Sequence, residues 1–456
     1  MPKLGIVADD LTGATTVGAL LARVGVDTAV LFDPAFIATA EDHDALIVST
    51  NSRALPAKKA RKRVRKATEH LRQRGAQLFA KRIDTTCRGG IGPEVEGMLE
   101  ALGDDHVAIV VPAMPQSRRI VVGGYSLIDS VLLARTAAAS DVRTPVTESH
   151  LPTLLAGQFS GPVGHVGLDA LLAGPDSLES ALTERRANGA RAILVDATSI
   201  EDVDAIATAL VRLGWAVVCV DPGPFTERMA IRSGVVDTAP VVERRTRTEP
   251  AASDHGTVLV VAGSAMSVTH TQLNRLREVP GTAVISVGIR PLVADGPVFR
   301  AEADRIVAEV GQLIGSQDGP RVLLLGLESS LSGQLVEFDE LERTVGLAPG
   351  LAAALVPARL GELGRLVADA LGESLTGLYL TGGDVMVAGC RAMEASGIKL
   401  VDYVIPQADQ GVLVGGPYAG VPVVCKGGMT GTELTAVQCV NRVFDEKVKN
   451  SESVHV

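Results

Sequence analysis

The chain has few aromatic residues and no long apolar run. Only 3% of its 456 residues are Phe, Trp or Tyr, while 46% are hydrophobic, so its cores must be built from Ala, Val, Leu and Ile. No apolar run approaches the roughly 18 residues that a membrane-spanning helix needs, and the N-terminal sequence does not resemble a signal peptide. A formal net charge of −10 is not the basic excess typical of nucleic-acid-binding proteins. These absences predict a cytoplasmic protein with neither a membrane nor a nucleic acid as partner.

Cysteine motifs and the common nucleotide fingerprints are also missing. The five cysteines are scattered and form no Cys-x-x-Cys pair, which excludes a zinc or disulfide framework and fits a reducing compartment. The sequence contains no Walker A motif, and no Gly-x-Gly-x-x-Gly follows the first predicted strand. Any nucleotide site must therefore be built in another way, in a chain long enough for two or three domains.

The first apolar stretch ends in two adjacent carboxylates. Residues 4–8 predict a buried parallel strand, Asp9 and Asp10 follow it, and residues 14–24 carry an apolar helix face. Ligands of open α/β sheets bind at the carboxyl ends of strands, and a metal, a cation or a substrate hydroxyl would relieve the repulsion between the two acids. The alternative is that Asp10 only caps the helix and Asp9 faces water.

A second polar stretch, KRIDTTCRGG at 81–90, follows the strand predicted over 76–83. Its cations, carboxylate, hydroxyls and glycines suit an anionic ligand that carries hydroxyl groups, although an ordinary polar loop can have the same composition. The basic helix predicted over 56–73 is expected to be a solvated surface. His150 is expected to be a local hydrogen-bond partner rather than a ligand group.

Strands and helices alternate along both halves of the chain. This order predicts an α/β fold of two domains, each built on a mostly parallel sheet flanked by helices. Residues 241–256 are polar and charged without a hydrophobic period, and we interpret them as an interdomain linker. The predicted domains span residues 1–240 and 257–448, followed by a tail at 449–456.

Three turns between strand and helix in the second half are rich in small residues. Gly263 and Ser264 follow the strand predicted over 257–262, and the other two turns contain residues 382–384 and 426–428. Glycines let a phosphate approach the backbone closely, and the following helix presents its positive end to the phosphate. Three such turns in one domain favour a nucleotide site, although each is also compatible with a tight connection alone.

The segments that carry these features keep a characteristic order over nearly the whole chain. They are ADDLTGA at 8–14, KRIDTTCRGG at 81–90, PAMPQSRRIVVGGY at 112–125, RTPVTESH at 143–150, AGS at 262–264, TGGD at 381–384 and KGGMTG at 426–431. In order and spacing the chain resembles the four-carbon acid sugar kinase family, which includes ATP-dependent threonate, erythronate and 3-oxo-tetronate kinases.

The resemblance implies an N-terminal acid-sugar-binding domain and a C-terminal nucleotide-binding domain, with ATP and Mg²⁺ as cofactors. ATP would phosphorylate the terminal hydroxyl of a four-carbon sugar acid and give the 4-phosphate. Asp10 would be the catalytic base, with Asp84 as the second choice. The other candidates bind substrate (Asp9, Lys81, Arg88, Arg53 and Arg119) or nucleotide (Ser264, Gly382, Gly383, Asp384, Val385 and Gly428), and no residue is assigned as a metal ligand.

Some questions stay open at the level of sequence. The chain departs from the usual motifs of the family at 87–90, 223–234 and 427–431, so the choice among four-carbon acids is not decided. A non-catalytic sugar-acid sensor and an NAD-dependent oxidoreductase are alternative functions, and the missing Gly-x-Gly-x-x-Gly counts against the oxidoreductase. The expected partners are the sugar acid and ATP, with a homodimer as a possible assembly.

Overall fold

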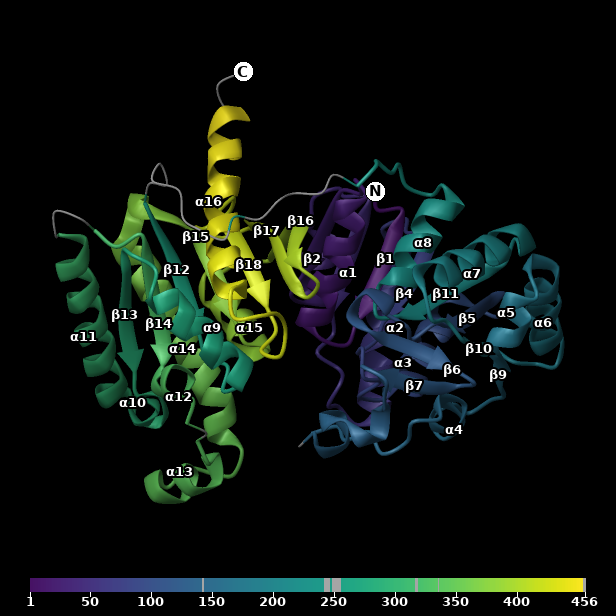
Figure 1. The fold of residues 1–456 in the computed structure, drawn as a ribbon, viewed down its shortest axis with the longest axis horizontal. Coiled ribbons are helices and arrows are strands. Elements are labelled where there is room, and N and C mark those ends of the chain that lie inside the picture. Colours follow the sequence, from purple (N-terminus) through teal and green to yellow (C-terminus); the bar gives the residue numbers. More distant parts are fainter. Residues whose placement is uncertain (142, 242–246, 248–255, 316–318, 335, 454–456) are drawn as a thin grey trace. The chain divides into compact units, whose positions relative to one another are not determined.

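The chain folds as two compact units (Figure 1). The structure is a computed structural model that describes residues 1–141, 143–241, 247, 256–315, 319–334 and 336–453. Unit 1 is Met1–Val242 and unit 2 is Glu243–Val456. Each unit contains a mostly parallel sheet flanked by helices, which confirms the predicted α/β class. Most of the predicted linker, 241–256, lies outside the described residues.

The main sheet of unit 1 is parallel throughout. In spatial order its strands are β2 (Thr28–Leu31), β3 (Ala45–Ser49), β1 (Leu4–Ala8), β4 (Leu78–Arg82), β11 (Ala216–Asp221), β5 (His106–Val110), β10 (Ala192–Val195) and β9 (Val163–Val166). Every residue of β1 is buried, which explains its continuous apolar sequence. A separate antiparallel sheet contains β6 (Arg119–Val122), β7 (Tyr125–Ile128) and β8 (Val131–Leu132).

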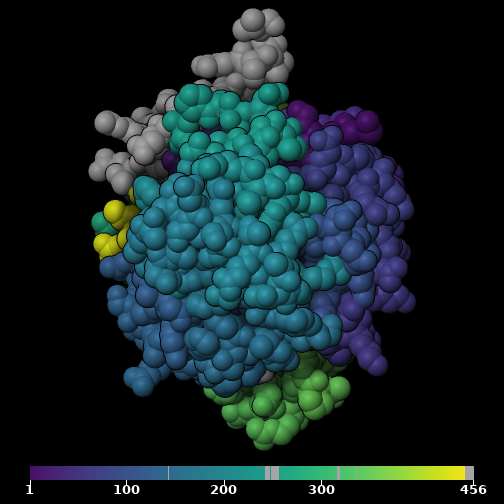
Figure 2. All heavy atoms as spheres, turned by 90° about the vertical axis from the view of Figure 1, so that its right-hand side faces the viewer, coloured from purple at the N-terminus to yellow at the C-terminus, as the bar shows by residue number. Residues whose placement is uncertain are grey.

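Helices cover both faces of the main sheet of unit 1. The crossover through α1 runs along the sheet in the opposite direction from those through α2 and α3, so right-handed connections place α1 on the opposite face. The helices are α1 (Leu11–Arg23), α2 (Ala57–Gln73), α3 (Ile91–Leu102), α4 (Leu151–Ala156), α5 (Leu168–Leu172), α6 (Pro175–Ala187), α7 (Ile200–Leu213) and α8 (Pro224–Ser233). In Figure 2 the teal atoms of α6 and α7 form a continuous surface without a deep hollow.

The sheet of unit 2 is parallel on one side and antiparallel on the other. Its parallel strands, in spatial order, are β13 (Thr282–Val287), β14 (Val322–Leu327), β12 (Thr257–Ala262), β15 (Leu375–Thr381) and β18 (Pro422–Lys426). The antiparallel strands β17 (Ala408–Val414) and β16 (Gly397–Ile405) continue it. The helices are α9 (Ser267–Arg277), α10 (Ile289–Val293), α11 (Gly296–Ile314), α12 (Glu328–Ser332), α13 (Phe338–Val345), α14 (Leu351–Leu371), α15 (Gly383–Ala392) and α16 (Thr435–Ser453).

The cores are aliphatic, as the composition predicts. In unit 1, side chains such as Val64, Leu71 and Val95 are completely buried between sheet and helices. The last helix, α16, continues to Ser453 and so includes most of the segment predicted as a tail, 449–456. The basic helix α2 is solvated as expected, with exposed lysines along its length.

Candidate functional site

Three neighbouring strands of unit 1 end at the same edge of the main sheet. β3, β1 and β4 lie side by side and are parallel, so the segments that follow them start from a common edge. Asp9 and Asp10 follow β1, Arg53 follows β3, and Arg82 ends β4. The charged residues that the sequence placed near strand ends are therefore brought together.

The two adjacent carboxylates are neutralised by two arginines. Arg53 donates to Asp9 from Nε at 2.7 Å and from Nη2 at 3.2 Å, and its Nη1 lies 2.7 Å from Oδ2 of Asp10. Arg82 adds contacts of 3.6 Å to Asp9 and 3.3 Å to Asp10. Cationic side chains are one of the partners suggested for this pair of acids, and Arg82 was not among the predicted site residues.

Asp10 also caps α1, because its Oδ1 accepts a hydrogen bond of 2.8 Å from the backbone of Gly13. Asp10 therefore caps the helix, but the interpretation that it only caps is wrong, because Arg53 and Arg82 also contact it. The interpretation that Asp9 faces water is wrong, since only 3% of that residue is exposed.

Gly13 allows Arg82 to reach the acids. A Cβ atom at position 13 would lie only 1.7 Å from Nη1 of Arg82 and 2.1 Å from its Cζ. The guanidinium thus occupies the space that any side chain at this position would fill. The glycine of the ADDLTGA segment is required by this close approach.

A second cluster is centred on Asp84, after β4. Arg88 donates to both its oxygens, from Nε at 2.8 Å and Nη2 at 3.1 Å, and Thr86 donates from its backbone and its hydroxyl. Arg53 lies 3.6 Å away and connects this cluster to the first. Burial raises the pKa of Asp84, but Arg53 and Arg88 outweigh burial and keep this pKa well below its usual range.

The same balance between burial and opposite charges applies to Arg53 itself and to Asp9. Burial disfavours its charge, but Asp10, Asp9 and Asp84 together raise its pKa well above the usual value. Burial likewise acts against the charge of Asp9, and Arg53 and Lys81 nevertheless lower its pKa. Arg53, Asp9 and Asp84 thus favour one another's charged forms at this edge of the sheet.

Lys81 differs from the other predicted substrate-binding residues. Its side chain is completely buried, with Nζ 2.7 Å from Oε2 of Glu94 and 2.8 Å from the carbonyl of Arg82. Its contacts favour a supporting role beneath Asp9 over direct contact with a ligand.

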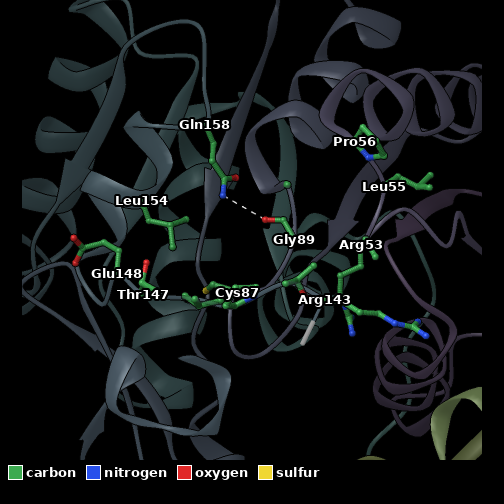
Figure 3. Close-up of a pocket in the computed structure, with 15 residues that line it drawn as sticks. Arg53, Leu55, Pro56, Cys87, Gly89, Arg143, Thr147, Glu148, Leu154 and Gln158 are labelled. Carbon is green, nitrogen blue, oxygen red and sulfur yellow. Dashed lines mark hydrogen bonds between the residues drawn. The ribbon is translucent and has the colours of Figure 1, made fainter. Parts of the chain in front are cut away.

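A cavity of about 560 Å³ opens beside the charged network (Figure 3). Of the predicted site residues, only Arg53 lines it. The other lining residues are Ala54, Leu55, Pro56, Cys87, Gly89, Gly90, Arg143, Thr144, Pro145, Val146, Thr147, Glu148, Leu154 and Gln158. Gln158 donates to the carbonyl of Gly89 at 3.3 Å, a bond that Figure 3 shows across the cavity.

The wall formed by residues 143–148 was missed as a binding surface. The segment belongs to RTPVTESH, which the sequence marked as a family motif without a role. His150, at its end, is a local hydrogen-bond partner as predicted, with Nδ1 2.8 Å from Oγ1 of Thr153.

Backbone strain occurs beside two of the three arginines of the network, Arg53 and Arg88. Asn51, shortly before Arg53, has φ of 45°, and Cys87, directly before Arg88, has φ of 53°. Non-glycine residues persist in this region when surrounding structure compels them, often at functional sites.

Arg119 lies outside the cavity lining. Burial lowers its pKa, although Asp84 and Asp129 act in the opposite direction.

In unit 2, the three small-residue turns converge. A Cβ atom on Gly428 would lie 2.4 Å from Oγ of Ser264, and one on Gly382 would lie 3.2 Å from the backbone nitrogen of Ser264. Thr269 links two of the turns, donating to the carbonyl of Gly428 at 2.9 Å and to Ser264 at 3.1 Å. A Cβ on Gly263 would lie 2.4 Å from Val385.

The predicted nucleotide-binding residues therefore surround one region of unit 2. Gly383 begins α15, and Asp384 is exposed in the first turn of this helix. Lys426 ends β18 with a buried side chain, and its Nζ donates to the carbonyl of Gly427 at 2.6 Å. Among the described residues, Lys426 makes no ion pair, and burial lowers its pKa to about 8.

Neither a metal cluster nor a membrane span was found in the part of the chain that the structure describes. No group of three or more His, Cys, Asp or Glu side chains there is arranged to hold a metal ion. No described helix combines the length and apolar character needed to cross a bilayer.

Comparison with known proteins matches both units to families. Residues 4–229 match a sugar-binding N-terminal domain, and residues 259–436 match a nucleotide-binding C-terminal domain. A protein named D-erythronate kinase from Heliobacterium modesticaldum is 34% identical over 99% of both chains. One named D-threonate kinase from Bordetella bronchiseptica is 32% identical over 98% of both.

A solved structure supports the fold independently. A Salmonella typhimurium protein superposes with a TM-score of 0.76 and 22% identity, covering 96% of this chain and 98% of the other. At that identity the likeness shows the fold alone. Together with the two domain matches and the relatives above 30% identity over the full length, the comparisons show that the chain belongs to the four-carbon acid sugar kinase family.

Proposed function

We propose that the chain is an ATP-dependent kinase that phosphorylates the terminal hydroxyl of a four-carbon sugar acid to its 4-phosphate. The observation that carries this proposal is the cavity of about 560 Å³ beside an ionised arginine–carboxylate network in the sugar-binding unit. A small polyhydroxylated anion matches both features, since arginines pair with its carboxylate and carboxylates accept hydrogen bonds from its hydroxyls.

Asp10 is the better candidate for the base. Both carboxylates are contacted at both oxygens, but a pKa held well below its usual range makes the carboxylate of Asp84 a weak proton acceptor. The side chain of Asp10 is 28% exposed, against 7% for Asp84. In the proposed reaction the substrate hydroxyl attacks the γ-phosphorus, the bond from that phosphorus to the ADP oxygen breaks, and the hydroxyl proton moves to Asp10.

The remaining site residues position the charged groups of the site and neutralise their charge. Arg53 and Arg88 keep the acids ionised and oriented, Asp9 anchors Arg53, and Lys81 supports Asp9 from below. Arg119 is an additional cation near Asp84. Phosphoryl transfer requires such positioning and charge neutralisation more than covalent chemistry.

ATP is proposed to bind where the small-residue turns of unit 2 converge. Gly382 and Gly428 pack closely against Ser264, Gly383 and Asp384 begin the helix that follows, and Val385 packs against Gly263. Mg²⁺ usually reaches kinases on the substrate phosphates with one or two carboxylates rather than in a protein cage. The exposed Asp384 is a residue that could join it, and the ion would neutralise phosphate charge.

The test is Asp10→Asn, assayed by ADP release with D-threonate, D-erythronate and 3-oxo-tetronate. Asparagine keeps the helix cap but is not a base, so we expect kcat to fall by about 100-fold or more. Asp33→Asn is the matched control, because Asp33 is an exposed aspartate that also caps a helical turn, with Oδ1 accepting from Ala35 at 2.8 Å.

The outcomes separate the alternatives. Activity of Asp10→Asn within a few-fold of the parent would remove Asp10 as the base. Binding of an acid by the parent without ADP release would favour the sensor, and NADH formation would favour the oxidoreductase.

A further inference from the structure

Two arginines line the cavity of unit 1, and they differ in what they contact. Arg53 is bound to Asp9 and Asp10 and lies 3.6 Å from Asp84. The guanidinium of Arg143 makes no hydrogen bond or ion pair with any other described residue, although its side chain lines the same cavity. One arginine is therefore already neutralised, and the other still lacks an anion.

The backbone at Arg143 is held although its guanidinium is free. Oδ1 of Asp141 accepts hydrogen bonds from the backbone of Arg143 at 3.0 Å and of Thr144 at 2.8 Å. Oδ2 of Asp141 lies 2.9 Å from Nη1 of Arg88, which also binds Asp84. The wall that carries Arg143 is thus tied to the charged network through Arg88.

In this contact with Arg88, the carboxylate of Asp141 is favoured in its ionised form. Burial raises the pKa of Asp141, but hydrogen bonds from the Thr144 backbone and from Arg88 outweigh it and bring the pKa to about 2. Arg88 cannot serve a ligand as freely as Arg143, because its guanidinium is divided between Asp84 and Asp141.

The opposing charge in the cavity lining is Glu148. Its Oε1 accepts a hydrogen bond of 2.7 Å from the backbone of His150. Figure 3 shows Glu148 at one end of the cavity, beside Leu154, and Arg53 and Arg143 toward the other end. An anion next to Arg143 would therefore avoid Glu148.

We propose that Arg143 binds the carboxylate of the four-carbon acid and so selects an acid over a neutral polyol. This inference rests on the proposed function. A substrate held at Arg143 would share the cavity with Arg53, which contacts Asp9 and Asp10. Arginine suits this role because its planar guanidinium can donate two parallel hydrogen bonds to one carboxylate.

The experiment varies the residue and the substrate charge together. Arg143→Gln, Arg143→Lys and the parent are compared on D-threonate, on D-erythronate and on the amides of both acids, which replace the carboxylate by a neutral group of similar shape. Dissociation constants are measured by calorimetry, and kcat/KM by ADP release. Arg72→Gln is the matched control, because Arg72 is an exposed arginine of α2 that lies outside the cavity lining and has no ion pair among the described residues.

We expect Arg143→Gln to weaken binding and kcat/KM for the acids by about 10- to 100-fold, the range for a charged hydrogen bond. We expect less than about a threefold change for the amides, since a neutral group gains little from a cation. Arg143→Lys should recover part of the loss, because it keeps the charge without the paired donors. Arg72→Gln should match the parent throughout.

Failure of the inference and failure of the proposed function give different results. Equal losses on acids and amides, or no loss on either, would overturn the role of Arg143 while leaving a working acid kinase. A parent protein that neither binds nor phosphorylates any of the acids would overturn the proposed function and this inference with it.

Discussion

The candidate sites of the two units obtain their charge from different sources. In unit 1, arginine and carboxylate side chains from three strand ends pair with one another. In unit 2, the corresponding region consists of glycine-containing turns, one serine, and a lysine bound to carbonyl oxygens. One site is built from side chains and the other mainly from backbone.

The difference shows what each ligand would require. A small acid with several hydroxyls needs charged groups at fixed positions, and mutual pairing holds those groups in place before a ligand arrives. A triphosphate needs many donors close together, which backbone N–H groups provide where no Cβ intervenes. The two sites should therefore respond differently to the same kind of substitution.

The largest effect is expected for Gly13→Ala in unit 1. By helix propensity alone the change would stabilise by about 1 kcal/mol, but the new Cβ would lie 1.7 Å from Nη1 of Arg82. Displacing a buried partner of two carboxylates costs about 3–5 kcal/mol, so the clash should dominate. Unfolding followed by the fluorescence of Trp215, the only tryptophan, reports on this unit.

The control for Gly13 is Gly161→Ala, in the same unit. No atom lies within 4 Å of a Cβ at position 161, and its φ is not positive. Its stability should change by less than about 1 kcal/mol. Equal stability of the Gly13 and Gly161 variants would contradict the steric role of Gly13.

A smaller and more selective effect is expected for Gly382→Ala in unit 2. Gly382 has φ of 106°, and its Cβ would lie 3.2 Å from the nitrogen of Ser264. Strain of about 1–3 kcal/mol in this conformation should lower ATP affinity by about 10-fold or more, with binding of the sugar acid unchanged. Titration calorimetry with each ligand measures both.

Gly372→Ala is the control that separates the general effect of backbone strain from a specific effect on the ATP site. Gly372 also has positive φ, of 52°, but no atom lies within 4 Å of its Cβ position. We expect a loss of stability with ATP affinity retained. Equal weakening of ATP binding by both variants would show that the turn at Gly382 has no special part in the site.

The elements that sequence alone predicted well are those decided by local pattern. β1 and β12 have the predicted bounds, because continuous apolar runs fix them without reference to distant residues. The antiparallel pair β16 and β17 and the small sheet of unit 1 were not predicted, since their pairing depends on partners rather than on apolar runs.

Only part of the candidate site was predicted, for the same reason. The strand-end rule located Asp9, Asp10 and Asp84. It could not locate Arg82 as their partner or Arg143 on the cavity wall. The position of Arg82 depends on the missing side chain at Gly13. The position of Arg143 depends on a segment without helical or strand periodicity, whose backbone is held by Asp141.

The smallest expected effect concerns the charge of Lys426, the contrast to the paired cations of unit 1. Burial lowers its pKa from the usual 10.5 to about 8, so the folded state holds fewer protons on this group than the unfolded chain between these two pH values. The stability of the parent relative to Lys426→Met should therefore be constant below pH 8, rise by about 1–3 kcal/mol as pH increases toward 10.5, and then level off. Urea unfolding followed by circular dichroism measures this difference, with Trp215 fluorescence identifying the transition of unit 1. A difference that stays constant up to about pH 10.5 and falls only above it would mean that Lys426 is stabilised as a cation, and the two units would then hold their cations in the same way.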